Sequence, residues 1–280
     1  MLEWRFSLVT RHSSCLGVLF LGLAAAQSTH LELDLLDQQI IEERATKLSK
    51  KVAERRATLE QLFREAGCDG ANLTTEKVHG SKEPNVICTL KGQDVSAGAI
   101  VVGGHFDLVT AGMGAVDDWS GVVLLPSLYQ SLKSRPRRHD LIFVGFAAEE
   151  TGLNGSHQFV KDLTPAQRSA IHAMINLECL GLTPPKVWAS RADPHLLDAY
   201  SRIASTLHLP AEGMNVDKVG DDDSHPFRDA KIPTLTIHSL TQETWPILHS
   251  PRDNVDAIDA DDYYAAYRLA ATLLAYLDSK

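Results

Sequence analysis

GGHFD at 103–107, VDDWSG at 116–121 and AAEETG at 147–152 are the three stretches that decide how this chain folds. The first and the last follow short apolar runs rich in Val, Ile, Leu and Phe, which are typical of buried strands in a mostly parallel sheet. Four such runs occur, at 99–104, 139–147, 170–177 and 233–238. Because helical patterns separate them, the sequence predicts an α/β fold in which helices cover a parallel sheet.

Residues able to bind a metal gather at one predicted edge of that sheet. Ligands of such folds bind beyond the carboxyl ends of the strands. Polar residues stand at those ends, or in loops that can reach them: His105, Asp117, Glu149, Glu150, Glu178 and His249. Carboxylates at the end of a buried strand are costly unless a cation compensates them. The six residues therefore predict one two-metal hydrolytic site, built without an H-E-x-x-H motif, which the chain lacks.

Each piece also has an ordinary structural interpretation. Asp117 can bridge two cations with its two oxygens, whereas helix capping suits Asp118 better. One of Glu149 and Glu150 can bind metal while the other acts as a general base, or both can form a solvated acidic turn. Asp107 can orient the ring of His105, although a His-x-Asp pair is often only a surface feature. The residues alone leave these interpretations open.

The N-terminal segment has the features of a secretory signal peptide. Arg5 and Arg11 precede a 12-residue apolar run, at 15–26, that ends in three alanines. The run is too short to cross a bilayer, and a core helix is the alternative. We expect residues 1–26 to be removed on export, to the periplasm or outside the cell. The mature chain, 27–280, is then expected to be a single soluble domain with no membrane partner.

Charge argues against nucleic acid as a partner. Without residues 1–26, which carry two arginines and one glutamate, the 27 basic and 36 acidic residues become 25 and 35, a net charge of −10. An acidic surface disfavours nucleic acid and anionic membranes. Three cysteines remain. Cys68 and Cys88 are close in sequence, and export permits a disulfide between them. Cys179 is expected to point away from the metal and to fill apolar space, because adjacent strand residues face opposite sides.

Apolar spacing predicts the remaining elements. One long amphipathic helix is expected over 34–66, stopped by Gly67 and packed on the sheet. A strand pair is expected at the sheet edge, over 77–90. Further helices are expected at 119–132, 155–163, 194–207 and 259–277.

Together, the motifs GGHFD, VDDWSG, FAAEETGLNGS, NLECLGL and LHSPRD resemble those of metallopeptidase family twenty-eight. This is the co-catalytic zinc family of bacterial leucyl aminopeptidases, glutamate carboxypeptidases and, more distantly, glutaminyl cyclases. The resemblance covers roughly residues 80–278, with the motifs in the expected order. It implies a three-layer α/β/α sandwich with a mixed, mostly parallel central sheet of about eight strands.

The resemblance also implies a role for each residue. Asp117 would bridge two zinc ions, with the Asp117–Asp118 peptide cis. His105 and Glu178 would complete one zinc site, and Glu150 and His249 the other. Glu149 would be the general base, and Asp107 would orient His105. Cobalt or manganese could occupy the same ligands, which select metals weakly.

Two positions depart from the family. Glu178 stands where relatives usually have Asp. The segment that usually reads Ser-Asp-His before Pro-Phe reads DDSHPF at 222–227. Asp222, Asp223 and His225 therefore receive no role, and His238, near the same edge, is equally ambiguous.

We therefore expect an exported zinc aminopeptidase whose substrate is a peptide with a free N-terminus. The zinc ions would activate a water molecule and polarise the carbonyl, and Glu149 would move the proton to the leaving amine. Two alternatives remain open. A glutaminyl-cyclase-like acyltransferase would need only one zinc ion, and a non-catalytic binding module on the same fold would tend to lose ligands.

Overall fold

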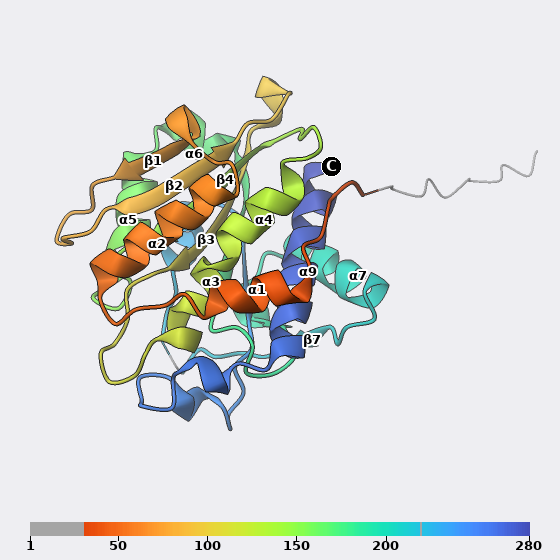
Figure 1. Ribbon diagram of the computed structural model, residues 1–280. Coiled ribbons are helices and arrows are strands. Elements are labelled where there is room, and N and C mark those ends of the chain that lie inside the picture. Colours follow the sequence, from red (N-terminus) through yellow and green to blue (C-terminus); the bar gives the residue numbers. More distant parts are fainter. Residues whose placement is uncertain (1–30, 219) are drawn as a thin grey trace, which may run out of the picture. The chain divides into compact units, whose positions relative to one another are not determined.

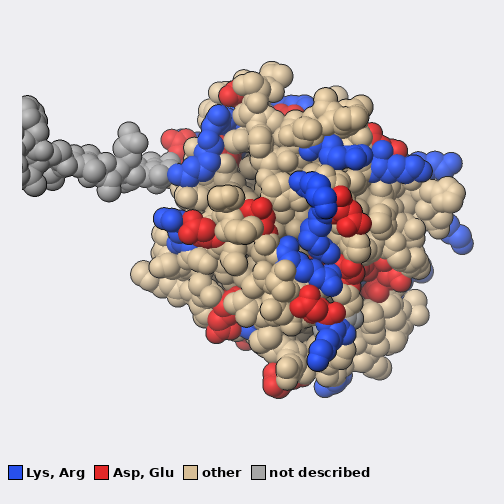
Figure 2. Space-filling model, turned by 180° about the vertical axis from the view of Figure 1, so that it is seen from behind, with Lys and Arg blue, Asp and Glu red and all other residues tan. Residues whose placement is uncertain are grey.

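The computed structural model describes residues 31–218 and 220–280. The predicted signal peptide, 1–26, lies outside the described residues. Within them, no helix combines the length and the apolar character needed to cross a membrane. On the face seen in Figure 2, Lys and Arg side chains lie interspersed with Asp and Glu.

An eight-stranded mixed sheet runs through the molecule in the order β1-β2-β4-β3-β5-β8-β6-β7 (Figure 1). The strands are β1 (Leu73–Glu76), β2 (Asn85–Leu90), β3 (Ala99–His105), β4 (Asp140–Phe146), β5 (Ile171–Glu178), β6 (Lys186–Val187), β7 (Glu212–Gly213) and β8 (Thr234–His238). The four central strands, β4, β3, β5 and β8, are parallel and correspond to the four predicted apolar runs. β1–β2, β2–β4 and β6–β8 pair antiparallel.

Helices cover both faces of the sheet. One face packs against α1 (Gln38–Ala45), α2 (Val52–Glu65), α4 (Leu124–Leu132), α7 (Pro194–Thr206) and α9 (Ala260–Asp278). On the other face lie α5 (Asn154–Asp162), α6 (Pro165–Ala170) and α8 (His225–Asp229). There, Phe159 of α5 and Phe227 of α8 pack on Phe146 and Val101 of the sheet. Figure 1 shows α2, α4 and α9 in front of the sheet and α5 and α6 behind it. The predicted three-layer sandwich with a mixed, mostly parallel sheet is confirmed.

The long helix predicted over 34–66 is wrong, because two helices occupy that segment. α1 ends at Ala45 and α2 begins at Val52. Between them, the hydroxyl of Thr46 donates to the carbonyl of Glu43 at 2.7 Å, and the hydroxyl of Ser49 accepts from the amide of Lys51 at 3.1 Å. Such side chains compete with helical hydrogen bonds and favour a break. The break lets α1 pack on α9 while α2 packs on α4 and β2.

The other boundaries shift by smaller amounts. The predicted strand pair at 77–90 is displaced: β1 ends at Glu76, and the connection to β2 contains Gly80, at φ +82°, and Pro84. The predicted helix at 119–132 is interrupted at Val123, between α3 (Ser120–Val122) and α4. Short helical turns occupy Gly70–Asn72 (η1), Val95–Ala97 (η2), Ala115–Trp119 (η3), Ala189–Arg191 (η4), Trp245–Ile247 (η5) and Val255–Ala257 (η6).

A disulfide joins Cys68, just past the end of α2, to Cys88 in β2, and this confirms the predicted pairing. Both cysteines are fully buried in the core between the helices and the sheet. The bond therefore ties the helical N-terminal segment to the antiparallel side of the sheet.

Candidate metal centre

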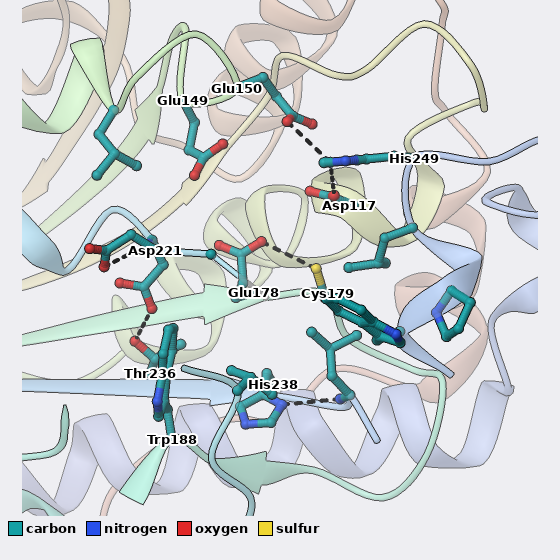
Figure 3. A pocket seen from close by; sticks show the side chains of 18 residues that line it. Asp117, Glu149, Glu150, Glu178, Cys179, Trp188, Asp221, Thr236, His238 and His249 are labelled. Atoms are coloured by element: carbon teal, nitrogen blue, oxygen red, sulfur yellow. Dashed lines mark hydrogen bonds and ion pairs between the residues drawn. The ribbon is translucent and has the colours of Figure 1, made fainter. Parts of the chain in front are cut away.

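Parallel pairing brings the predicted metal-binding residues to one edge of the sheet. β3 ends at His105, the neighbouring strand β5 ends at Glu178, and Glu149 and Glu150 follow the end of β4. Asp117 lies in the turn η3, ahead of α3. His249 follows η5. Figure 3 shows Asp117, Glu149, Glu150, Glu178 and His249 lining one cavity.

One set of donors is buried at the base of the cavity. The Nε2 atom of His105 lies 3.2 Å from Asp117 Oδ1 and 3.6 Å from Glu178 Oε1. The side chain of His105 is 1% exposed. One donor atom from each of these three residues lies within 4.8 Å of the other two, a spacing that allows them to bind one ion. The longer side chain of Glu178, where relatives have Asp, therefore reaches the other two donors.

A second set of donors lies nearer the solvent. The Nε2 atom of His249 lies 3.0 Å from Asp117 Oδ2 and 3.2 Å from Glu150 Oε2. The side chain of His249 is 54% exposed. Asp117 thus offers one carboxylate oxygen to each set, and these three residues also meet the 4.8 Å spacing.

Glu149 faces the first donor set without joining a hydrogen bond. Its Oε2 lies 3.8 Å from His105 Nε2, and in the described part of the chain its carboxylate accepts no hydrogen bond. A third combination of donors, His105 with Glu149 and Glu150, also meets the 4.8 Å spacing. The two neighbouring glutamates therefore point to different partners: Glu150 to His249, and Glu149 to His105.

Asp107 fixes the backbone that carries both glutamates. Its Oδ1 accepts from the amide of Glu149 at 3.0 Å, and its Oδ2 accepts from the amide of Glu150 at 3.1 Å. The His105 Nδ1 atom lies 3.5 Å from Asp107 Oδ1, which is too long for a strong hydrogen bond. The predicted orientation of His105 by Asp107 stays a prediction, while the anchoring of two amides is observed.

Asp118 has a wider structural function than the helix cap expected for it. The Asp117–Asp118 peptide is cis, as the family resemblance implies. The fully buried Asp118 carboxylate accepts three main-chain hydrogen bonds, from His105 at 3.1 Å, Gly121 at 3.1 Å and Cys179 at 3.0 Å. It therefore ties the ends of β3 and β5 to the first turn of α3. The sequence around Asp118 does not distinguish this structural role from that of an ordinary helix cap.

Burial disfavours the charged form of three carboxylates in the cavity, those of Glu149, Glu150 and Glu178. Burial raises the pKa of Glu149 to about 10 and that of Glu150 to about 7, and it also raises the pKa of Glu178. Neighbouring carboxylates reinforce the effect. Divalent cations are the usual compensation for such a cluster, and imidazole with carboxylate is a normal zinc donor set.

For the two histidines of the donor sets, the neighbouring carboxylates favour the charged form and raise the pKa. The hydrogen bond with Asp117 raises the pKa of His249 to about 9. Burial opposes the charge on Asp117, but hydrogen bonds from His105 and His249 hold its pKa below the ordinary value. Without a metal ion, protonated imidazoles compensate the charge of Asp117. A divalent cation bound between the same residues would compensate it instead. The donor set fits a pair of divalent ions.

The cavity has a volume of about 590 Å³ and combines the acidic donors with apolar walls. Those walls, which the sequence did not reveal because they come from distant loops, include Leu153, Trp188, Val216, Leu240, Trp245, Pro246 and Leu248.

The prediction that Cys179 points away from the metal site is wrong. β5 ends at Glu178, and Cys179 adopts a left-handed φ of +51°, so strand alternation does not reach it. Its thiol donates to Glu178 Oε1 at 3.3 Å and lines the cavity (Figure 3). The predicted burial in an apolar environment is confirmed, since Cys179 is 2% exposed and packs with Val116 and Leu240.

Of the four residues without an assigned role, Asp222 and His238 line the same cavity, whereas Asp223 and His225 do not. His238 is neutral and structural: its Nδ1 accepts from the Leu240 amide, and its Nε2 contacts the Met214 carbonyl, both at 3.0 Å. Asp222 accepts from Thr236 at 2.6 Å, and His225 pairs with Asp221 on the surface. Asp223 is fully buried, and neither of its oxygens has a hydrogen-bond partner among the described residues.

Comparison with known proteins agrees with this geometry. Residues 85–274, more than half of the chain, match the family model described as Peptidase family M28. The chain belongs to peptidase family M28. The family predicted from the five motifs is thus confirmed, and its members carry the same α/β fold.

Two curated relatives of this M28 chain are aminopeptidase YwaD of Bacillus subtilis (strain 168) and leupeptin-inactivating enzyme 1 of Streptomyces exfoliatus. They are 28% identical over 199 residues and 30% identical over 182 residues. The alignments cover 68% and 64% of this chain, but 42% and 38% of the relatives. The chain therefore spans less than half the length of these two proteins.

Solved structures share the M28 fold. BSAP, a zinc aminopeptidase from Bacillus subtilis, superimposes with a TM-score of 0.65 at 23% identity, covering 71% of this chain and 50% of BSAP. An Acidobacteriales bacterium glutaminyl cyclase superimposes with a TM-score of 0.71 at 18% identity, covering 91% and 98%. At these identities the likeness concerns the fold alone.

Proposed function

We propose that this M28 chain is an exported zinc-dependent aminopeptidase, which hydrolyses the first peptide bond of substrates with a free N-terminus. The observation that carries the proposal is the position of Asp117. Its two carboxylate oxygens face two different histidines, each of which has a second carboxylate partner. That arrangement is the one a bridging carboxylate between two cations requires.

Five residues would hold the two zinc ions: His105 and Glu178 on one side, Glu150 and His249 on the other, and Asp117 between them. Zinc bound there would supply a Lewis acid and lower the pKa of a water molecule. The raised pKa values of Glu150 and Glu178 support this assignment, because buried carboxylates of this kind are stable as anions when a cation lies beside them.

Glu149 would be the general base. It would take a proton from the attacking water and deliver it to the amine of the leaving peptide. Its carboxylate faces the donor set, and no hydrogen bond within the described residues occupies it. Because Asp107 holds the amides of Glu149 and Glu150, the base is kept at a fixed place while its side chain stays free to react.

The cavity favours an amine-bearing substrate. Its carboxylates would attract the charged N-terminus of a peptide, and its apolar walls, among them Trp188 and Leu240, would receive an uncharged side chain. The disulfide between Cys68 and Cys88 supports the proposed export, because such bonds persist in oxidising compartments.

A glutaminyl-cyclase-like activity is the second candidate. It is favoured by the superposition on the Acidobacteriales enzyme, which covers nearly the whole of both chains. Against it stands the second donor set, since the cyclase reaction would need only one zinc ion. The non-catalytic alternative is disfavoured because none of the predicted donors is missing.

The decisive experiment combines metal analysis with substrates of both classes. We expect the purified protein to bind two zinc ions and to release amino acids from a panel of aminoacyl p-nitroanilides, with activity lost in a chelator and restored by zinc. One zinc ion, with ammonia released from N-terminal glutamine, would favour the cyclase. Zinc binding without either activity would favour the binding module.

A further inference from the structure

A buried arginine lies directly behind the predicted metal-binding loop. Arg55, in the first turn of α2, is 0% exposed. Its guanidinium donates to the main-chain carbonyls of Phe106 at 3.1 Å, Asp107 at 3.0 Å and Met113 at 3.4 Å, and also to that of Gly114. A buried charge is costly unless its hydrogen bonds are made, and these four carbonyls offset much of that cost, although Nε has no hydrogen-bond partner among the described residues.

The four carbonyls lie at the two ends of one loop. Phe106 and Asp107 directly follow His105 at the end of β3, and their carbonyls accept hydrogen bonds from Arg55 Nη1. Met113 and Gly114 lead into η3, which carries Asp117, and their carbonyls accept hydrogen bonds from Arg55 Nη2. Because a guanidinium is planar and rigid, its two nitrogens hold the two ends of the loop at a fixed separation.

Other contacts reinforce the second end of the loop. The Gly114 carbonyl also accepts from the amide of Trp119 at 3.2 Å, and the Arg55 guanidinium carbon lies 5.2 Å from the centre of the Trp119 ring. Inside the loop, by contrast, the bond from the Gly112 amide to the Val109 carbonyl is long, at 3.5 Å. Asp253 also holds the second end, since its carbonyl accepts from the Met113 amide and its Oδ1 from the Val116 amide, both at 2.7 Å. The Arg55 guanidinium differs in that its bonds reach both ends of the loop.

We propose that Arg55 is a positioning residue of the metal centre, whose guanidinium sets the separation of His105 and Asp117. The donor set formed by these two residues with Glu178 would then depend on Arg55 for its affinity. This inference rests on the proposed function only in that the donor set binds a metal ion. It does not require that the protein hydrolyse peptides.

A purely electrostatic role would act in the opposite direction. The acidic groups that stabilise the charge of Arg55 include Asp118, Asp253, Asp107 and Asp117, several of which surround the metal-binding site. A fixed positive charge there repels a divalent ion and attracts the same carboxylates. Removing the charge would by itself strengthen metal binding, whereas loss of positioning weakens it. The sign of the change therefore separates the two roles.

The chain offers a matched control in Arg44 of α1. Arg44 is also buried, at 9% exposed, and donates to Ser127 Oγ at 2.7 Å and Gln130 Oε1 at 2.6 Å. These partners belong to α4, away from the metal-binding loop. Arg44→Met should destabilise the protein through lost hydrogen bonds without changing the metal centre.

The test measures zinc affinity by chelator competition in wild type, Arg55→Met, Arg55→Lys and Arg44→Met. Loss of a residue that orients metal ligands typically weakens binding about 10- to 100-fold. We expect that loss for one of the two zinc ions in both Arg55 variants, because a lysine ammonium cannot span both ends of the loop. Arg44→Met should bind both ions as tightly as wild type.

Hydrogen exchange of the metal-free proteins gives a second, independent measurement. Amides of residues 106–118 should exchange faster in both Arg55 variants than in wild type, and at the wild-type rate in Arg44→Met. Unchanged or tighter zinc binding in folded Arg55→Met would overturn the inference. If that variant does not fold, wild-type zinc affinity in Arg55→Lys would overturn it instead. A wild-type protein that binds two zinc ions but cleaves no peptide would reject the proposed function and leave this inference standing.

Discussion

Replacing Glu149 by glutamine tests the proposed mechanism most directly, because it separates proton transfer from metal binding. Glutamine keeps the shape of the side chain and removes its ability to accept a proton. The Glu149 carboxylate makes no hydrogen bond to other described residues, and its amide stays held by Asp107, so the substitution should leave the fold intact. We therefore expect the variant to retain both zinc ions.

The expected loss of activity follows from the environment of the side chain. General-base assistance contributes about 100- to 10,000-fold, or about 2.7–5.5 kcal/mol at about 1.36 kcal/mol per tenfold. The Glu149 side chain is only 13% exposed, so bulk solvent has little access to replace it as proton acceptor. We expect kcat to fall about 1,000-fold or more, with little change in KM.

Glu150→Gln is the matched comparison. Glu150 contacts His249 at 3.2 Å and also accepts from the Val109 amide at 3.1 Å. If it binds zinc, its substitution should lose metal, activity and stability together, since bound metal contributes to folding. The assay measures kcat and KM on leucine p-nitroanilide alongside zinc content and melting temperature. A Glu149→Gln protein that keeps activity within about tenfold of wild type would refute Glu149 as the base.

Three further outcomes are expected. His105→Ala should reduce zinc stoichiometry from two ions to one, measured by metal analysis at saturating zinc; a wild-type protein that never exceeds one ion would contradict it. Replacing Cys68 and Cys88 by alanine should lower the free energy of unfolding by about 3 kcal/mol, because the bond closes a loop with a sequence separation of 20; an unchanged urea midpoint would argue that the bond does not form. Burial lowers the pKa of His238 to about 4, so metal-free protein should lose up to about 3 kcal/mol of stability as pH falls from about 6.5 to 4, where the unfolded chain takes up a proton and the folded one does not. A His238→Gln variant with the same pH dependence of unfolding would exclude this contribution.

The central sheet and the metal-binding residues were predictable because each depends on local pattern. Uninterrupted apolar runs mark buried parallel strands wherever they occur, and His105 and Glu178 stand at the ends of such runs. Parallel topology then brings those ends together without further information. The short strands β6 and β7, of two residues each, carry no such pattern, and the sequence does not predict them.

The features that the sequence predicted wrongly or did not predict depend on single backbone angles, on local hydroxyl hydrogen bonds or on partners distant in the chain. The break between α1 and α2 follows from hydroxyl hydrogen bonds of Thr46 and Ser49, which apolar spacing does not record. Cys179 enters the cavity because of one left-handed φ angle at the end of β5. Arg55 gave no signal, because its partners are carbonyl groups about 50 residues away in a loop, and carbonyl groups are common to every residue type.

The donors of the proposed metal centre come from segments as far apart as His105 and His249, so a partly folded chain does not hold a complete set. A ligand that binds only the native state stabilises it by mass action, about 2.7 kcal/mol for each site when free ligand is 100 times its Kd. For a domain of ordinary marginal stability, two such sites are a large share of the total. The fraction of this protein that stays folded, and so its resistance to neighbouring proteases, would follow the free zinc concentration around it.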